Sequence, residues 1–417
     1  MVLEFTGEIT DPIHKYIRFT EVEKKIIDTE VFQRLRKIRQ LAGAHLVYPS
    51  AQHTRFEHSI GAMHLAGLAA QTLLDKGYIE CKEDVESLRI AALLHDIGHG
   101  PFSHLFEEVL LQNKPKKKKK ISHEIIGKKI IKETIIIDIL GQYGYDPDYV
   151  SKLSFGETQN IFYNEIIAGS LSADIMDYLP RDSFFTGTEY GKVDYYRLIS
   201  SFEVLSNGHL GINKSAINSL ESMLISRYQM FKAVYFHKTV RAGEVMLLHS
   251  LASADKQFHF SNISIEEYLE YTDEKTIDVI CSLKGNKFAS DLALDYKKRK
   301  LFKCVYEKFL QNKSNVFDKE SANQQIRDFL GRITEYLDID ERFIFIDISR
   351  APSMPLTPSK EELNSIMLVD KDLEFETPTS EIPLIDSITG FLDMIRIYTT
   401  EENREKLEKV LRNMDLK

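Results

Sequence analysis

The sequence predicts a mainly α-helical fold, with a large helical core followed by a smaller C-terminal α+β module. Over the first 250 residues, apolar side chains recur every three or four positions in several successive segments, as in amphipathic helices. After about residue 340, short β-branched or alternating segments favour strands instead. We therefore expect a core at 1–250, a helical extension at 251–340 and the α+β module at 341–417.

Composition excludes several classes of protein. The 417 residues have a formal net charge of −9, which argues against a basic nucleic-acid-binding surface but leaves room for a local cationic pocket. Three cysteines without paired spacing make a disulfide framework or a cysteine-rich zinc site unexpected. Neither a signal peptide nor a long apolar span is visible, so we expect a cytoplasmic protein without membrane contact.

The core elements are predicted in chain order from periodicity and turn residues. A turn at Asp11-Pro12 precedes a short strand, and a helix follows over 21–41, its other face rich in arginine and lysine. After a loop at 42–54, a helix over 55–76 contains many small residues that permit close packing, and another helix covers 82–94. The lysine-rich segment 113–120 is interpreted as a solvated loop rather than a phosphate-binding element.

Later elements follow the same rules. Ser122 is a candidate N-cap, and helical patterns continue through 160–178. Segments 202–205 and 209–212 form a predicted hairpin around Ser206-Asn207-Gly208, before a long helix over 214–250. Short helices are expected to residue 337, then strands at 343–348, 364–369 and 394–399 and a last helix at 401–413.

The segment from His95 to His104 concentrates groups that can bind a metal. His95 and Asp96 can offer an imidazole nitrogen and a carboxylate oxygen to one ion, and the helical period places His95 at the core-facing end of its helix. Gly98 and Gly100 allow the backbone to approach a ligand closely. The decapeptide alone leaves two interpretations open: a metal site, or helix-end residues that cap backbone carbonyls.

The wider pattern resembles the HD-domain phosphohydrolases, in which a histidine, a His-Asp pair and a distant aspartate bind one metal. His58, His95-Asp96 and Asp174 occur here in that order. Segments 32–41, 55–61, 95–104, 178–182 and 235–238 further resemble the deoxynucleoside triphosphate triphosphohydrolases of this superfamily. The resemblance extends from about residue 8 to residue 245, and more faintly through the tail.

This resemblance implies a role for each matching residue. It implies that the divalent metal, which the sequence does not identify among Mn, Mg, Fe, Ni and Zn, is bound by His58, His95, Asp96 and Asp174. His123, His99 and Asp96 are the implied catalytic residues. The implied substrate contacts are Gln40, Leu41, Arg55, His99, His104, Tyr178, Asp182, Arg227 and Tyr235. Taken singly, such residues have plainer explanations, since Arg55 could form a surface ion pair, Tyr235 could pack in the core and His104 could cap a helix.

The chemistry of triphosphate hydrolysis requires these residue types. A metal polarises the phosphoryl oxygen and helps to activate water. Imidazole is suited to protonating the departing 5′-oxygen at neutral pH, and arginine offers a bidentate fork to phosphate oxygens. The implied reaction converts a deoxynucleoside triphosphate and water to a deoxynucleoside and inorganic triphosphate.

The resemblance also implies nucleotide-dependent assembly into homo-oligomers. Asp28, Gln33, Arg36 and Arg197 match positions that bind an activating guanine nucleotide in the family. Two departures weaken the match: Gly7 and Thr10 replace a lysine and an asparagine before the Asp-Pro-Ile turn, and Ile175 replaces a lysine after the last metal-binding aspartate. Two alternatives therefore remain, an HD-domain enzyme acting on another nucleotide (a 5′-nucleotidase or phosphodiesterase) and a non-catalytic nucleotide-binding regulator.

Overall fold

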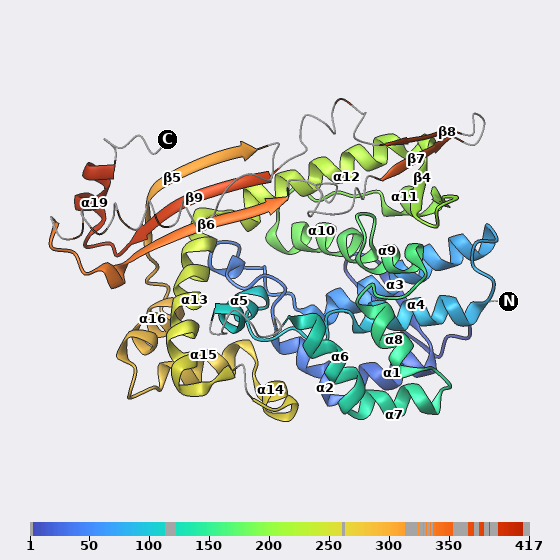
Figure 1. The fold of residues 1–417 in the computed structure, drawn as a ribbon, viewed down its shortest axis with the longest axis horizontal. Helices are drawn as coiled ribbons and strands as arrows, with labels where there is room; N and C mark the ends of the chain where they lie inside the picture. The colour runs from blue at the N-terminus through green and yellow to red at the C-terminus, as the bar shows by residue number, and fades with distance from the viewer. Residues whose placement is uncertain are drawn as a thin grey trace.

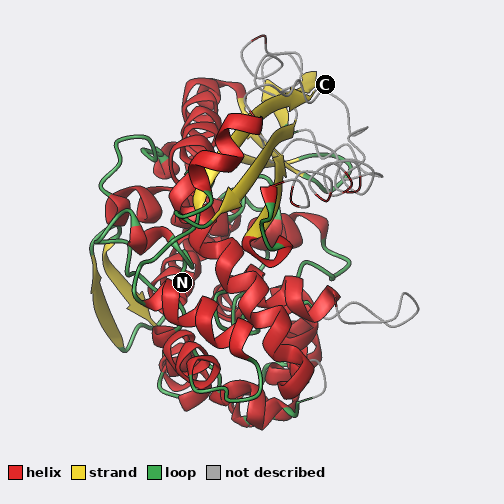
Figure 2. Cartoon of the chain, turned by 90° about the vertical axis from the view of Figure 1, so that its left-hand side faces the viewer, coloured by secondary structure: helices red, strands yellow, loops and turns green. Residues whose placement is uncertain are grey.

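Helices make up most of the described chain, as Figure 2 shows. The computed structural model describes residues 3–112, 122–260, 263–312, 337–352, 366–370, 375–378 and 391–411, and the isolated positions 324, 328, 331, 334 and 383. The predicted lysine-rich loop lies outside these residues. No helix among them is long and apolar enough to cross a membrane. The predicted fold class, a mainly helical core with a smaller C-terminal α+β part, is confirmed.

The chain begins with a β-hairpin rather than a single strand. Strands β1 (Gly7–Asp11) and β2 (Lys15–Phe19) pair in antiparallel register around the predicted turn. The helix predicted over 21–41 is wrong, because the chain forms α1 (Glu21–Ile27), α2 (Glu30–Gln33) and the 3₁₀ turn η1 (Arg34–Lys37). Thr29 interrupts the helix, since its hydroxyl donates to the Ile26 carbonyl and accepts from the Phe32 N–H.

The centre of the core is a set of closely packed helices. Helix α3 (Arg55–Asp75) packs against α4 (Lys82–Leu94) and α10 (Ala173–Thr186), and its small residues allow the predicted close approach. At Gly61, an added Cβ would lie 1.9 Å from a carboxylate oxygen of Asp177 on α10. A side chain at that position would therefore push α10 away from α3.

Helices α5 (His104–Gln112), α6 (His123–Glu133), α7 (Ile135–Gln142), α8 (Pro147–Ser154) and α9 (Ile161–Ala168) complete this part of the core. The predicted N-cap is confirmed, because Ser122 accepts from the Ile125 N–H. After α11 (Tyr195–Ser200), the predicted hairpin is present as β3 (Phe202–Val204) and β4 (Leu210–Asn213).

The long helix predicted over 214–250 is wrong. The chain forms η3 (Lys214–Ala216), α12 (Ile217–Met230), a π-helical turn η4 (Phe231–Tyr235) and, after a break, α13 (Lys238–Phe258). His237 is extended at the break and caps α13 through its side chain, which accepts from the Thr239 N–H. The π turn places Tyr235 at the cavity described below.

The C-terminal part forms two small sheets. After α14 (Ile265–Glu270), α15 (Asp273–Cys281) and α16 (Lys287–Lys297), strands β5 (Lys303–Asn312), β9 (Phe391–Thr399) and β6 (Ile344–Pro352) form an antiparallel sheet in that order. Strands β7 (Met367–Asp370) and β8 (Phe375–Pro378) extend the β3-β4 hairpin, with β7 parallel to β4. Helix α19 (Arg404–Leu411) follows β9.

The strand predictions near 343–348 and 394–399 and the last helix are confirmed, as is the described part of the strand predicted at 364–369. The prediction of short helices up to residue 337 is wrong at 303–312, where the chain forms strand β5, and strand β8 was not predicted. Figure 1 shows the β5-β9-β6 sheet beside α13, which contacts β5 and β6. Strand β5, before residue 340, pairs with β9 after it, and β7, after residue 340, pairs with β4 before it. Both sheets therefore cross the predicted domain boundary near residue 340, which stays a prediction.

Candidate metal centre and adjoining cavity

Three elements bring the four predicted metal ligands together. His58 lies in the first turn of α3, His95 caps the C-terminus of α4, Asp96 follows it, and Asp174 lies in the first turn of α10. The Nε2 atom of His58 is 3.0 Å from Asp174 Oδ1, and the Nε2 atom of His95 is 3.8 Å from the same oxygen. Asp96 is 3.7 Å from His58 Nε2 and 3.4 Å from His95 Nε2.

Both histidines are oriented in the way that metal-binding imidazoles usually are. The Nδ1 of His58 is held by Asp177 at 2.8 Å, and the Nδ1 of His95 is held by the Ala92 carbonyl at 2.6 Å. Each Nε2 is buried without a hydrogen-bond partner among the described residues, although both face Asp174. These two nitrogens and the carboxylates of Asp96 and Asp174 therefore fit a divalent cation.

The charges around the site also indicate that it can bind a divalent cation. Burial lowers the pKa of His58, but its ion-pair contact with Asp174 and its hydrogen bond to Asp177 outweigh that effect and raise the pKa to about 10. Burial raises the pKa of Asp174, but contacts with His58 and His95 more than offset it and hold that pKa below its usual range. The carboxylates of Asp96 and Asp174 thus attract positive charge to the two Nε2 atoms, and a divalent cation would replace a proton there.

Asp177 was not predicted as a site residue, yet it is the main support of His58. One of its carboxylate oxygens accepts from His58, the other accepts from His14 Nε2 at 2.6 Å, and Arg181 donates to both oxygens at 2.8 Å. Arg181 also donates to Asp11, so the β1-β2 hairpin is tied to this carboxylate. The only feature of the sequence that points to Asp177 as a site residue is its position three residues after Asp174.

The predicted substrate residues and most of the metal ligands line one cavity of about 590 Å³. Arg55 pairs with Asp96 and also donates to Ser103 Oγ at 2.7 Å. Tyr235 donates to Asp182 at 2.7 Å, and Arg227 contacts the Tyr178 hydroxyl. The other predicted residues on the lining are Gln40, Leu41, His99, His104 and His123.

The predicted sharing of one helix face by Asp174, Tyr178 and Asp182 is confirmed, because α10 runs through all three and each lines the cavity. Burial raises the pKa of Tyr178 to about 12, so the hydroxyl stays protonated and can donate a hydrogen bond. His53 was not predicted; its Nε2 lies 2.7 Å from Asp182 and fixes that carboxylate from behind. Ile175, the expected departure from the family pattern, also lines the cavity.

The four predicted guanine-nucleotide residues lie outside this cavity lining. Gln33 donates to the Ile27 carbonyl and accepts from Arg36, whereas Arg197 on α11 donates to the Ser215 carbonyl. Asp28 is exposed at the end of α1. Their role stays a prediction.

Comparison with known proteins identifies the family to which the chain belongs. Residues 55–179 match a family model described as HD domain, and residues 193–416 match one described as HD associated region. An uncharacterised protein of Methanocaldococcus jannaschii is 34% identical, covering 98% of this chain and 84% of its own length. A solved structure of a hypothetical protein from Aquifex aeolicus covers 97% of this chain at 30% identity, with a TM-score of 0.77.

Some of the relatives have names that state an activity. A Dictyostelium discoideum protein named deoxynucleoside triphosphate triphosphohydrolase SAMHD1 homolog is 35% identical, covering 61% of this chain and 50% of its own length. A solved structure of a phosphohydrolase from Bacteroides thetaiotaomicron covers 95% of this chain at 25% identity, with a TM-score of 0.75. The resemblance inferred from the sequence is confirmed, and the chain belongs to the metal-dependent HD-domain phosphohydrolases that have an HD-associated region.

Proposed function

We propose that this protein hydrolyses deoxynucleoside triphosphates to deoxynucleoside and inorganic triphosphate. The observation that carries the proposal is that one cavity joins three of the four candidate metal ligands, three further histidines and the predicted nucleotide contacts. Its volume of about 590 Å³ lies within the range of small-molecule sites. The SAMHD1-named relatives support the substrate class.

In this reaction, the oxygen of water bonds to the α-phosphorus, the bond from phosphorus to the 5′-oxygen breaks, and that oxygen takes up a proton. A metal held by His58, His95, Asp96 and Asp174 would supply Lewis-acid stabilisation of the phosphoryl group. His123 begins α6, and Glu107 holds its ring through Nδ1, which leaves Nε2 to deliver the proton. Arg55 offers a buried guanidinium to the phosphates.

The cavity also offers contacts for the nucleoside. Tyr178 and Tyr235 present aromatic rings and hydroxyl groups, and Arg227 presents a cation beside Tyr178. Gln40 and Leu41 line the same cavity, and by the family resemblance they lie against the deoxyribose, where a 2′-hydroxyl is excluded. The site would thus select a deoxyribonucleotide by shape at the sugar and by charge at the phosphates.

The test is incubation of the purified protein with each of the four deoxynucleoside triphosphates, with Mn²⁺ or Mg²⁺ added. We expect deoxynucleoside and inorganic triphosphate in equal amounts, and loss of both products in Asp174→Ala. Absence of triphosphate with every substrate and metal would show that the proposal is wrong.

Ile175 favours a second candidate within the same family. An isoleucine in place of the lysine removes one cation from the phosphate end of the cavity, so a less charged nucleotide could be the substrate. A 5′-nucleotidase would cleave nucleoside monophosphates faster than any triphosphate, and a phosphodiesterase would cleave cyclic nucleotides. The same assay with these substrates separates the three activities.

Regulation by a guanine nucleotide and assembly into a homo-oligomer are also proposed, from the resemblance at Asp28, Gln33, Arg36 and Arg197. Adding GTP or dGTP should raise the rate and shift the protein to a dimer or tetramer in light scattering. A non-catalytic regulator would bind these nucleotides without releasing any product.

A further inference from the structure

The part of the cavity wall that α13 contributes contains a largely buried network of charged side chains. The guanidinium of Arg241 donates to both carboxylate oxygens of Asp347 on β6, at 2.7 and 3.1 Å, and to one oxygen of Glu244 at 2.6 Å. Ser349 also donates to both oxygens of Asp347, at 3.0 and 3.1 Å. Arg241 and Glu244 line the cavity, whereas Asp347 is not part of the lining.

Stability alone is a poor explanation for this network. Taking charged groups out of water costs free energy that their mutual attraction need not recover, and apolar side chains of similar size often stabilise a protein as well. The Arg241 guanidinium holds the pKa of Asp347 below its usual range, although burial raises it. When Glu244 is also ionised, two carboxylates oppose one guanidinium, and the excess negative charge lies at the cavity.

Glu244 has spare hydrogen-bonding capacity. Arg241 holds one of its carboxylate oxygens, and the other has no hydrogen-bond partner among the described residues. Burial raises the pKa of Glu244, whereas the contact with Arg241 opposes this shift and favours the ionised form. An ionised carboxylate held in this way can accept a hydrogen bond from a bound molecule but cannot donate one.

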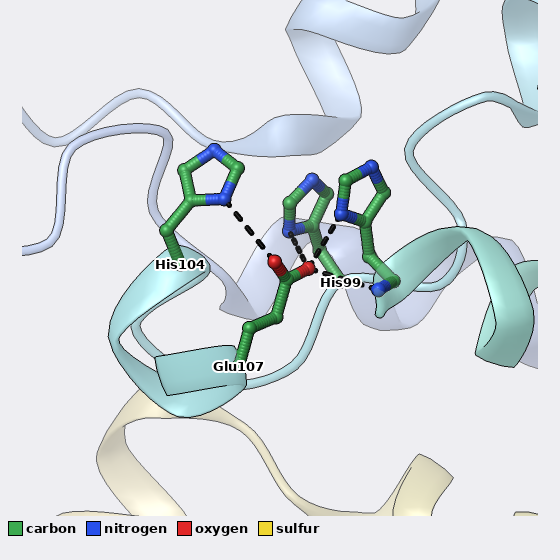
Figure 3. A group of neighbouring side chains, drawn as sticks. His99, His104 and Glu107 are labelled. Atoms are coloured by element: carbon green, nitrogen blue, oxygen red, sulfur yellow. Dashed lines mark hydrogen bonds and ion pairs between the residues drawn. The ribbon is translucent and has the colours of Figure 1, made fainter. Parts of the chain in front are cut away.

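The groups that can attract phosphates come from other elements of the cavity. Arg55 lies on α3, and three cavity histidines lie between the end of α4 and the first turn of α6. Figure 3 shows two of them, His99 and His104, pointing toward Glu107 on α5. Because a carboxylate repels phosphate groups, a bound nucleotide should place its phosphates near Arg55 and these histidines rather than against Glu244.

The lining around Glu244 is apolar and suits a nucleobase. Leu41, Ala44 and Val240 belong to one apolar cluster, and an added Cβ at Gly43 would lie 3.1 Å both from the Val240 carbonyl oxygen and from Glu244 Cγ. A flat base can lie on such a surface, where a single polar group then fixes its orientation. Cytosine and adenine present an exocyclic amino group to an acceptor, whereas thymine presents a carbonyl oxygen and a methyl group at that edge.

We propose that Glu244 is a specificity-determining residue, which accepts a hydrogen bond from the exocyclic amino group of a cytosine or adenine base. Arg241 and Asp347 are positioning residues, because they act through Glu244 and hold its carboxylate at the cavity. This inference rests on the proposed function, since it requires a nucleotide in the cavity. It also gives the C-terminal sheet a role, because β6 supplies Asp347.

The test compares dCTP with dTTP, two pyrimidine nucleotides of similar size, at about pH 8, where the carboxylate is ionised. The wild type should have a kcat/KM for dCTP at least about tenfold above that for dTTP, because the charged acceptor has no amino group to bind in thymine. Glu244→Gln should bring the two values to within about twofold of each other. An amide can donate to the thymine oxygen as readily as it accepts from the cytosine amino group.

Two further variants separate positioning from a structural role. Asp347→Asn should reduce the ratio of the two kcat/KM values by at least about threefold, because Arg241 loses its charged partner. A merely structural residue would change both values together and leave their ratio at that of the wild type. Glu165→Gln is the matched control, since Glu165 forms a similar pair with His209 at 2.7 Å, outside the cavity lining, and its ratio should equal that of the wild type.

Binding gives the same comparison without turnover. In titration calorimetry with a chelator present, dCTP should bind the wild type more tightly than dTTP, and Glu244→Gln should bind both equally. A wild type that does not prefer dCTP overturns the inference, and so does a preference that Glu244→Gln retains. If triphosphate is released but the ratio is the same in all variants, the proposed function stands without this inference. If no triphosphate is released, the binding ratio still decides the role of Glu244.

Discussion

At the scale of single residues, the orientation of His58 depends on groups outside the predicted ligand set. Asp177 accepts hydrogen bonds from His58, His14 and Arg181, and all four side chains are buried. A carboxylate that holds the outer nitrogen of a metal ligand fixes its tautomer and increases its basicity. We therefore expect Asp177 to control metal affinity without touching the metal.

Asp177→Asn should weaken metal binding at the HD centre by about 10–100-fold. The amide presents one acceptor oxygen where the carboxylate presents two, so either His58 or His14 loses its partner. Affinity can be measured by competition with a chelator. Asp148→Asn, at an exposed carboxylate on α8, is the control for the substitution itself. Equal affinities in both variants would contradict this role of Asp177.

Ile175 offers a test of how the cavity handles phosphate charge. Ile175→Lys restores the cation expected from the family, and one charge-assisted hydrogen bond is worth about 1.5–3 kcal/mol. We expect the KM for a deoxynucleoside triphosphate to fall by about tenfold. Ile175→Met fills the same space without charge and should leave KM near its wild-type value. Steady-state kinetics on both variants separate charge from volume.

The site was partly predictable because the chain order of its ligands is distinctive. His58, His95, Asp96 and Asp174 were identified from spacing and resemblance, and the structure brings them together, while their roles stay predictions. Asp177, His14 and Glu107 were missed. Their importance follows from contacts with residues 119, 163 and 16 positions away, respectively, and such contacts leave no periodic signal in one sequence.

At the scale of elements, the loop between α4 and α5 sets how closely α6 approaches the candidate metal centre. Gly98 lies against the first turn of α6, and an added Cβ would be 2.0 Å from the His123 carbonyl oxygen and 2.4 Å from the Gly127 nitrogen. Both neighbours are backbone atoms, so they cannot rotate away. The glycine therefore brings His99 to a ring-centroid distance of 4.1 Å from His123.

Gly98→Ala should destabilise the fold by about 1–3 kcal/mol, because α6 must shift to admit the methyl group. It should also reduce turnover by moving His123 away from His99. Gly141→Ala on α7 is the matched control, since nothing lies within 4 Å of the added Cβ and alanine favours a helix. Thermal unfolding should show a lower Tm for the first variant and an unchanged or higher Tm for the second.

The elements that were predicted correctly are those with strong local signals. Helices α3 and α4 have long apolar repeats, and the β3-β4 hairpin has an Asn-Gly turn, with Gly208 at φ +83°. The errors have local and long-range causes. Thr29 and His237 cap new helices inside continuous apolar patterns. Strand β5 is stabilised by pairing with β9, about ninety residues later, which no local window contains.

At the scale of the whole molecule, Asp273 joins the extension after α13 to the catalytic core. It begins α15 and accepts hydrogen bonds from the backbone N–H groups of Phe102, at 2.8 Å, and Arg39, at 3.0 Å. Phe102 has a φ of +57°, a conformation that costs free energy in a non-glycine residue. Asp273 therefore helps to hold the loop that precedes His104.

Burial raises the pKa of Asp273 to about 6, which makes global stability depend on pH through this group. Because the folded protein binds this proton more tightly than the unfolded chain, the ionised carboxylate costs stability above pH 6. That cost disappears as the pH falls from about 6 toward 4. The free energy of unfolding of the wild type, minus that of Asp273→Asn, should increase by about 1 kcal/mol between pH 7 and pH 5. Denaturant unfolding at the two pH values measures this difference, and other titrating groups cancel in the comparison.

Asp278→Asn, at an exposed carboxylate on the same helix, controls for the substitution. A difference that stays constant or decreases over this range would show that Asp273 is ionised in the folded protein without a cost, and that the loop is held independently of its proton.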